Sequence, residues 1–152
     1  MKNFRGLDFF EFDSSYVVYA KIQETADSPP FKMKTTTDTP ADFRKYGTLI
    51  FNINDEQYTL TAYENLDYLD VEGYENYLFL PFLDKTNGYE TYGGGRYIDL
   101  YQYDNDSILI DFNRAYNPQC VYDENFSCPI VPRENLLNFR VEAGVKNFIS
   151  SY

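Results

Sequence analysis

The 152-residue sequence contains no histidine and no tryptophan, and it has only two cysteines. Without histidine, the chain cannot use Ser-His-Asp or Cys-His catalysis, a zinc site with histidine ligands, or the commonest general base. Any enzyme made from it would have to work with carboxylates, tyrosine, lysine, arginine or cysteine. We expect no resident metal and no cofactor, and whether the protein is an enzyme is left open by the sequence.

Positive charge is scarce: 13 lysine and arginine residues stand against 24 aspartate and glutamate residues, which gives a net charge of -11. A field of this sign repels phosphate backbones and anionic lipid surfaces, so we expect neither nucleic acid nor a membrane as a partner. Long apolar runs are also missing, and none approaches the ~20 residues of a membrane helix.

The opening sequence MKNFRGLDFF lacks the apolar region of a signal peptide, which favours a cytoplasmic location for the chain as given. An export signal removed from the N-terminus would reverse that expectation. The oligomeric state is left open by the sequence.

Aromatic residues, in contrast, are abundant, with 16 tyrosines and 13 phenylalanines. Both types favour pleated, half-buried surfaces, and 152 residues suffice for one domain with a sizeable core. Short stretches of alternating polar and apolar residues between turns add to this signal. We therefore predict a single all-β domain over residues 1–152, a barrel or flattened sandwich of about eight short antiparallel strands with little helix.

Two hairpins and several single strands are expected from this alternation. In the clearest hairpin, Leu49, Phe51 and Ile53 form one apolar face. Pro81 cannot donate to a sheet ladder, which predicts an edge or a bulge at that point. The expected strands are Ser14–Glu24, Phe31–Thr37 at an edge, the hairpin of Tyr46–Ile53 with Gln57–Tyr63, Tyr77–Leu83, a second hairpin of Arg96–Tyr103 with Ser107–Phe112, and Asn138–Ala143.

Turn-forming, charged and aromatic residues crowd most densely between Leu80 and Pro129. This stretch contains Arg96, which follows three glycines, and Arg114. The planar guanidinium fork suits a carboxylate or phosphate, and the amides of a glycine run can form an anion-binding nest. Alternatively, both arginines pair with acids inside the fold, because a buried unpaired charge is costly. The candidate partners are then Asp84, Glu90, Asp99, Asp111 and Glu142.

Four carboxylates in or near this stretch have two possible uses. Two of them facing across a barrel mouth would suit acid–base hydrolysis of the glycosidase type. Alternatively, each caps a turn or a loop. A calcium loop is not predicted, because the glycine after DKTN falls one place early and the closing glutamate is wrong. The four residues are Asp84, Glu90, Asp111 and Glu142.

The run DFNRAYNP alternates polar and aromatic residues. As a pocket wall, it would present Asn113, Tyr116 and Asn117 to a ligand, with Tyr92 and Tyr97 nearby to stack on it. As a strand end, its side chains would only satisfy loop backbone. Both accounts remain open at this point.

Cys120 and Cys128 enclose a loop of seven residues. A disulfide would staple this loop, whereas a cytoplasmic location would keep both thiols reduced. These two states remain open. A catalytic cysteine is the least favoured, because a reactive thiol usually has a histidine partner.

Three segments resemble the protein family named domain of unknown function 1684 (DUF1684): PFLDKTNGYETYGGGRYID, LIDFNRAYNPQCVYDENFSCP and the tail ENLLNFRVEAG. The opening GLDFFEFDSSYVVYAKI is also similar to the start of that domain. The chain departs from the family pattern after the second cysteine, where Pro-Ile-Val-Pro replaces a run of prolines. The resemblance implies a domain found mainly in prokaryotes, without an established activity.

We therefore predict small-molecule binding in a pocket between residues 84–96 and 111–117. Arg96 and Arg114 would hold an anionic or polar ligand, and Tyr92 and Tyr116 would stack on it. A carboxylate-based hydrolase and a structural or interaction module with a buried motif are the alternatives. The other candidate residues, which would orient the arginines or bind ligand hydroxyls, are Asp84, Glu90, Asp111, Asn113 and Asn117.

Overall fold

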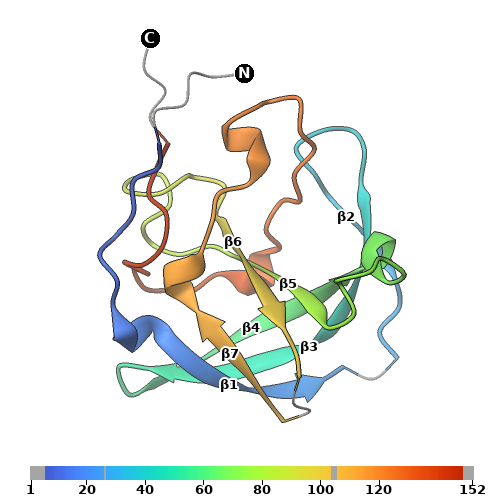
Figure 1. The fold of residues 1–152 in the computed structure, drawn as a ribbon, viewed down its shortest axis with the longest axis horizontal. Coiled ribbons are helices and arrows are strands. Elements are labelled where there is room, and N and C mark those ends of the chain that lie inside the picture. The colour runs from blue at the N-terminus through green and yellow to red at the C-terminus, as the bar shows by residue number, and fades with distance from the viewer. Residues whose placement is uncertain (1–5, 26, 104–105, 149–152) are drawn as a thin grey trace.

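The computed structural model describes residues 6–25, 27–103 and 106–148, and Figure 1 shows them forming a strongly curled antiparallel sheet. The expected all-β fold is confirmed, because the described residues contain no helix beyond short 3-10 turns. Among them, no helix is long and apolar enough to cross a membrane. The strands are β1 (Val17–Glu24), β2 (Phe31–Met33), β3 (Ala41–Ile53), β4 (Glu56–Asn65), β5 (Tyr77–Phe82), β6 (Arg96–Tyr101) and β7 (Ser107–Asp111), and the turns are η1 (Ser14–Tyr16), η2 (Leu66–Tyr68), η3 (Phe112–Arg114), η4 (Gln119–Val121) and η5 (Arg133–Asn135).

One continuous sheet runs in the order β6-β5-β4-β3-β1-β7, and β2 pairs with β3 beside this path. β2 is therefore an edge strand, as predicted for this segment, and it carries Lys32, a residue type that discourages pairing with other molecules. The sheet curls so that β6 and β7 come close to each other, yet these end strands share no ladder within the described part of the chain (Figure 1). The architecture is a curled half-barrel.

The predicted hairpin of β6 with β7 is wrong, although both segments are strands. β7 pairs with β1, where Ala20 lies opposite Ile108, and β6 pairs with β5, where Leu78 lies opposite Leu100. All four side chains are buried in the main core. Each strand thus finds a partner elsewhere in the chain whose apolar face matches its own, and these pairings outweigh the short connection between them.

The predicted hairpin of β3 with β4 is confirmed. Its turn uses Asn54 and Asp55 at φ values of 52° and 66°, a left-handed conformation that these two residue types tolerate. The ladder shifts register between Lys45 and Gly47. A Cβ on Gly47 would lie 2.7 Å from the carbonyl oxygen of Gln23, so only glycine lets β1 approach this bulge.

The two faces of the sheet carry separate apolar clusters, because successive strand residues point to opposite sides. Leu49, Phe51 and Ile53 lie in the main core, as predicted. The second cluster is smaller and forms the floor of the cavity described below. Its buried members are Met33, Phe43, Tyr63, Phe79, Tyr97 and Val131.

A side-chain amide completes the sheet near Pro81. Pro81 lies on β5, which has β4 on one side and β6 on the other. The ladder between β4 and β5 is limited to the pair of Tyr63 with Phe79. Beside it, Asn135 Nδ2 donates to the carbonyls of Thr61 and Pro81 at 2.8 Å each, and Asn135 Oδ1 accepts from the Thr61 N–H at 2.8 Å. The edge or bulge predicted at Pro81 is therefore wrong: β5 lies inside the sheet and keeps an unbroken register with β6, and Asn135 fills the gap on the side of β4.

The predicted strand Asn138–Ala143 is absent. Val141 and Ala143 are buried in alternation, as in a strand, but their backbone groups bond to side chains and not to a neighbouring strand. The Val141 N–H donates to Asp84, and the carbonyls of Val141 and Ala143 accept from Arg96. Buried residues thus alternate as predicted, but two charged side chains take the place of the ladder.

Replacing Asn135 with alanine removes all partners that this amide supplies to Thr61 and Pro81. We expect a loss of about 2–4 kcal/mol in the free energy of unfolding, because buried backbone groups are left unsatisfied. Urea denaturation followed by circular dichroism measures this loss. The matched control, Asn138→Ala at an exposed site, should change stability by less than about 0.5 kcal/mol, and equal effects of the two substitutions would contradict the account.

Candidate functional site

Arg96, the first residue of β6, lies inside the protein and is 0% exposed. Its Nη2 lies 3.4 Å from Asp84 Oδ1 and donates to the Val141 carbonyl at 3.0 Å. Its Nη1 donates to the carbonyls of Ala143 and Val145. Burial lowers the pKa of this guanidinium, and the Asp84 carboxylate opposes that shift. Arg96 therefore binds the protein's own C-terminal segment, in agreement with the internal-pairing alternative.

Asp84 is the buried partner of this arginine. Its Oδ2 accepts from the Val141 N–H at 2.8 Å and from the Thr86 hydroxyl at 2.8 Å. Its Oδ1 accepts from Asn87 Nδ2 at 3.1 Å. Both carboxylate oxygens are thus used inside the fold, and neither is available to a ligand at the surface.

Arg114 has the opposite environment, because it is exposed at the end of η3. The structure does not bring its guanidinium and that of Arg96 to a common opening. The glycine run forms a turn in which the Gly95 N–H donates to the Tyr92 carbonyl at 3.2 Å. The expected anion clamp of two arginines is therefore not assembled.

The other predicted carboxylates pair with cations or cap turns. Glu90 forms an ion pair with Arg140, and Glu142 Oε1 lies 3.7 Å from Nε of the same arginine. Asp111 Oδ1 accepts from the backbone and the side-chain nitrogen of Asn113 at 2.9 Å each, which caps η3. Asp84 is thus buried, Asp111 caps a turn, and Glu90 and Glu142 share Arg140 as their ion-pair partner.

The predicted asparagines tie loops together. Asn113 Oδ1 accepts from the Asp13 N–H at 3.0 Å, and its Nδ2 donates to the Asp13 carbonyl at 2.9 Å. Asn117 is buried, and its Nδ2 donates to the Tyr122 hydroxyl at 3.0 Å. Its Oδ1 is buried without a partner among the described residues. These contacts fit the structural use of the DFNRAYNP run.

The two cysteines and Tyr92 lie together beside this run. Both thiols are free in the structure, and the Cys120 N–H donates to Cys128 Sγ at 3.1 Å. Burial is the main cause that raises the pKa of Cys128 to about 12. Burial also raises the pKa of Tyr92, whose hydroxyl interacts with Cys120. Cys128 is therefore a poor nucleophile, in line with the low expectation of a catalytic cysteine.

Tyr116 is the predicted site residue that lines a substantial cavity. We call this cavity the tyrosine pocket; its volume is about 370 Å³, and it opens on the face of the sheet opposite the main core. No lysine or arginine is among its lining residues. These are Phe43, Asn65, Tyr68, Tyr74, Tyr77, Phe79, Tyr97, Asp99, Tyr101, Tyr116, Gln119, Ser127, Cys128 and Pro129.

Asp99 is the charged group of the tyrosine pocket. The hydroxyls of Tyr77 and Tyr116 both donate to its Oδ1, at 2.8 Å and 2.7 Å. Its Oδ2 accepts no hydrogen bond from any residue that the structure describes. Burial is the largest cause that raises the pKa of both phenols, and the proximity of Asp99 adds to the rise. The two tyrosines therefore stay protonated and orient the carboxylate.

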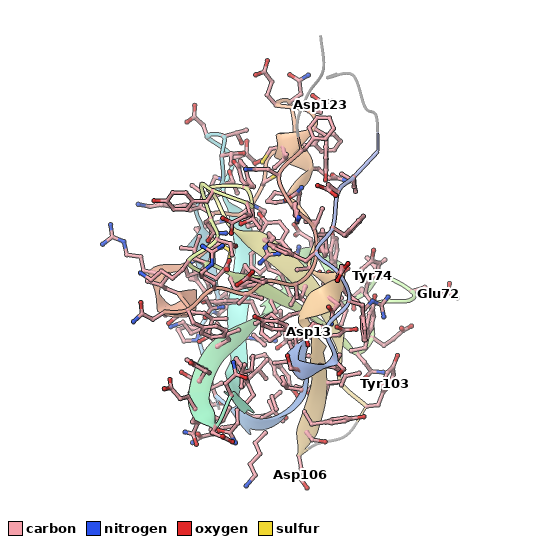
Figure 2. All side chains as sticks on the ribbon, turned by 90° about the vertical axis from the view of Figure 1, so that its left-hand side faces the viewer. Asp13, Glu72, Tyr74, Tyr103, Asp106 and Asp123 are labelled. Carbon is pink, nitrogen blue, oxygen red and sulfur yellow. The ribbon has the colours of Figure 1, made fainter. Side chains whose placement is uncertain are left out.

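The pairing of β5 with β6 builds this wall. Tyr97, Asp99 and Tyr101 alternate along β6, so their side chains share one face. Tyr77 lies opposite Tyr101 in the ladder. Tyr116 reaches the same place because its N–H and carbonyl exchange two hydrogen bonds of 2.9 Å with Tyr97. The rim includes Tyr74, which Figure 2 shows on the same projecting loop between β4 and β5 as Glu72.

Sequence reasoning missed Asp99 and Tyr77 as site residues, although a signal for them existed. The main core takes Ile98 and Leu100 of β6, so the alternating partners Tyr97, Asp99 and Tyr101 had to lie on the other face. Asp99 was considered only as a partner for an arginine. Two tyrosines flanking one carboxylate on the non-core face of β6 indicate the pocket.

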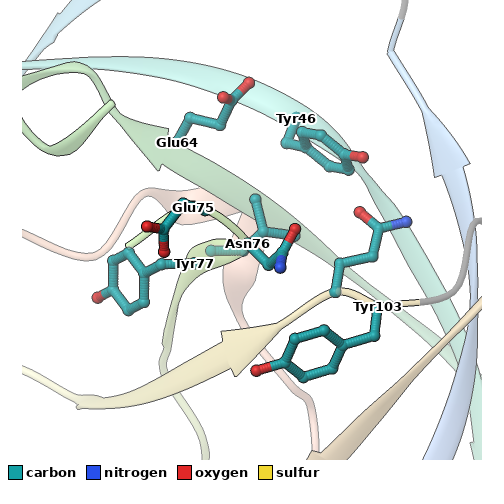
Figure 3. Close-up of a pocket in the computed structure, with 8 residues that line it drawn as sticks. Tyr46, Glu64, Glu75, Asn76, Tyr77 and Tyr103 are labelled. Carbon is teal, nitrogen blue, oxygen red and sulfur yellow. The ribbon is translucent and has the colours of Figure 1, made fainter. Parts of the chain in front are cut away.

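A second cavity of about 280 Å³ adjoins the tyrosine pocket and shares Tyr77 with it. Figure 3 shows Glu64, Glu75 and Tyr103 converging around this cavity, which basic residues do not line. Arg44 on β3 lies 3.4 Å from Glu64 but is not part of the lining. The two adjoining cavities therefore contain carboxylates as their charged groups.

The fold and site define a class: all-β half-barrel proteins with a tyrosine-lined pocket that encloses one carboxylate. The chain belongs to the family described as protein of unknown function (DUF1684), which matches residues 2–146 and confirms the resemblance found in the motifs. The solution structure of an uncharacterised protein from Haloarcula marismortui is similar, with 35% identity and a TM-score of 0.74 over 94% of this chain and 77% of the other. Among curated proteins, none matches.

The two motif arginines provide a direct contrast in stability. Arg96→Gln leaves Asp84 as an uncompensated buried charge, so we expect a loss of about 3–5 kcal/mol in the free energy of unfolding or a failure to fold. Arg114→Gln, at an exposed site, should cost less than about 0.5 kcal/mol. Chemical denaturation of both variants checks this, and similar losses would contradict the different placements.

The tyrosine pocket predicts a dependence of stability on alkaline pH. The folded-state pKa values of Tyr77 and Tyr116 are raised, so their contribution is fully present below the unfolded phenol pKa of about 10 and is lost as pH rises above it. Urea denaturation at about pH 8 and about pH 11 should therefore show a larger decrease for the wild type than for the Tyr77→Phe/Tyr116→Phe double variant. Equal decreases would show that these phenols are not coupled to folding.

Proposed function

We propose that the protein binds a small polar molecule in the tyrosine pocket. The proposal depends on one observation, the Asp99 carboxylate held by two protonated phenols in an open cavity. Small-molecule sites combine aromatic and apolar walls with a few convergent polar groups, and they usually occupy about 300–1,000 Å³. The tyrosine pocket, at about 370 Å³, has this composition and the lower part of this size range.

This proposal keeps the predicted function but moves its site. Tyr116 remains a wall of the pocket, whereas Arg96 and Asp84 support it from inside the fold. Arg96 begins β6, the strand that carries Asp99, so the buried ion pair fixes the start of the wall. An anionic ligand is no longer favoured, because the lining of the pocket contains a carboxylate and no basic residue.

The two alternatives explain the cavity less well. A glycosidase-like hydrolase needs two carboxyl groups on opposite sides of a bond, and the tyrosine pocket is lined by one. A purely structural module accounts for the buried network of Arg96 and Asp84, in which Arg96 Nε alone is without a partner among the described residues. It gives no reason for an exposed carboxylate, Asp99, whose second oxygen has no hydrogen-bond partner among the described residues.

A thermal-shift screen of polar metabolites tests the proposal. At least one compound should raise the melting temperature of the wild type and shift backbone amide resonances of β5 and β6. The same compound should have no effect on Tyr116→Ala, which removes one wall, but should stabilise Tyr19→Ala, a control at a tyrosine that is 75% exposed on β1. A screen with no stabilising compound, or with binding mapped away from β5 and β6, would contradict the proposal.

A further inference from the structure

We infer that the ligand of the tyrosine pocket is an organic cation with a methylated, quaternary ammonium group. This inference rests on the proposed function, because it names the chemical class that the same pocket accepts. It follows from three features of the pocket: the sign of its charge, the faces of its rings, and the hydrogen bonds that the Asp99 carboxylate already accepts.

The charge of the pocket favours a cation. Asp99 is its lining carboxylate, and the adjoining cavity is lined by Glu64 and Glu75. The whole chain carries a net charge of -11, so its field attracts cations toward a concave acidic surface. Of the two carboxylates in the adjoining cavity, Glu64 is paired with Arg44. Asp99 is the carboxylate that lines the tyrosine pocket itself and is therefore the charged contact for a ligand there.

The rings of the pocket lie at steep angles to one another. The planes of Tyr74 and Tyr77 meet at 88° with ring centroids 5.3 Å apart, and those of Tyr97 and Tyr116 meet at 85° with centroids 5.9 Å apart. Tyr77 and Tyr101 form a third pair, at 58° and 5.8 Å. An edge-to-face contact covers a face of only one of its two rings, and the face of an aromatic ring carries the negative part of its quadrupole.

Several of these rings remain accessible. Tyr74 and Tyr116 are each 38% exposed and Tyr101 is 44% exposed. A cation over such faces gains about 0.5–2 kcal/mol per favourable ring, and several rings around one methylated ammonium group are the usual way in which proteins recognise it. The same cavity is lined by the Asp99 carboxylate, whose negative charge attracts a cation that lies against the rings.

The hydrogen bonds of the pocket favour a quaternary over a primary ammonium. A primary ammonium has three N–H donors that require acceptors. In the tyrosine pocket, Asp99 Oδ1 already accepts from Tyr77 and Tyr116, and Oδ2 accepts from no residue that the structure describes. The other side-chain acceptors of the lining are neutral, as on Asn65, Gln119 and Ser127. A quaternary ammonium has no N–H group, so it needs only the charge of Asp99 and contact with the ring faces.

Arg114 supplies a test of the sign of the ligand's charge. It lies close enough to Tyr101 to offset part of the rise in the pKa of that phenol, but it does not line the pocket. A positive charge at this place repels a cationic ligand and attracts an anionic one. Arg114→Gln should therefore strengthen cation binding about twofold at low salt, with a smaller change at high salt, because exposed charges are screened.

Choline and its neutral carbon isostere 3,3-dimethylbutan-1-ol separate charge from shape. We would titrate each into the full-length protein and follow backbone amide resonances by two-dimensional NMR. Choline should shift the amides of β5 and β6 in a saturable manner. The isostere should bind at least about tenfold more weakly than choline, and a tenfold difference in affinity corresponds to about 1.4 kcal/mol. Ethanolamine, the primary ammonium analogue, should also bind more weakly than choline.

Substitutions in the pocket assign the roles of the carboxylate and the rings. Asp99→Asn should weaken choline binding about tenfold and leave the affinity for the isostere unchanged. Tyr116→Phe keeps the ring, so choline affinity should stay within about threefold, whereas Tyr116→Ala should lower it about tenfold. Each variant is compared only if its amide spectrum keeps the wild-type dispersion, and Tyr19→Ala is the control on a remote strand.

The outcomes separate this inference from the proposed function. Equal affinity for choline and its isostere, tighter binding of ethanolamine, or weaker choline binding by Arg114→Gln would overturn the cation inference. In each of these cases, shifts at β5 and β6 would still support a ligand pocket. If choline leaves these amides unchanged while a metabolite from the screen shifts them, the inference fails and the pocket stands. If no compound shifts them, both fail.

Discussion

The buried ion pair of Arg96 and Asp84 is the interaction on which the rest of this fold depends. Moving a guanidinium and a carboxylate out of water is costly, and the pair is tolerated when hydrogen bonds use most of its remaining donors and acceptors. Arg96 Nε is the one nitrogen of the pair that is buried without a partner among the described residues. The backbone of the C-terminal segment supplies partners to the pair, through three carbonyls and the N–H of Val141. The charged pair is therefore a joint between β6 and a segment that belongs to no strand.

This joint affects both faces of the sheet at β6. On the core side, it holds Val141 and Ala143 against the main cluster without a ladder. On the other side, it fixes the start of the strand whose next outward residues are Tyr97, Asp99 and Tyr101. The tyrosine pocket is thus built on a strand that is anchored by buried charge, which suits a site that must hold a carboxylate in a fixed orientation.

The sequence predicted those features of the fold that depend on local alternation. The all-β class, most of the strand positions and the hairpin of β3 with β4 follow from a period of two residues, and the structure agrees with them. The pairing of β6 and β7 was not predictable in this way, because strand partners depend on contacts far apart in the chain. Residues 138–143 alternate as a strand does, and nothing local indicates that Arg96 and Asp84 bond to their backbone.

The candidate site shows the same limit. Arg96 and Arg114 both lie in polar, turn-rich motifs, yet one is fully buried and the other is exposed. Their local sequences do not distinguish them, because burial is decided by the segment that packs over the first one. Tyr116 was predicted from its motif, whereas Asp99 required knowledge of which face of β6 points away from the core.

Native-state hydrogen exchange at the Val141 amide tests the central claim most directly. This N–H lies outside every ladder of the described chain, and its partner is Asp84 Oδ2 at 2.8 Å. If the buried ion pair is the joint that holds the fold, this amide should exchange as slowly as the core amides of β3 and β4, at rates set by global unfolding. Exchange as fast as that of an exposed loop would show that the joint opens independently and would contradict the account.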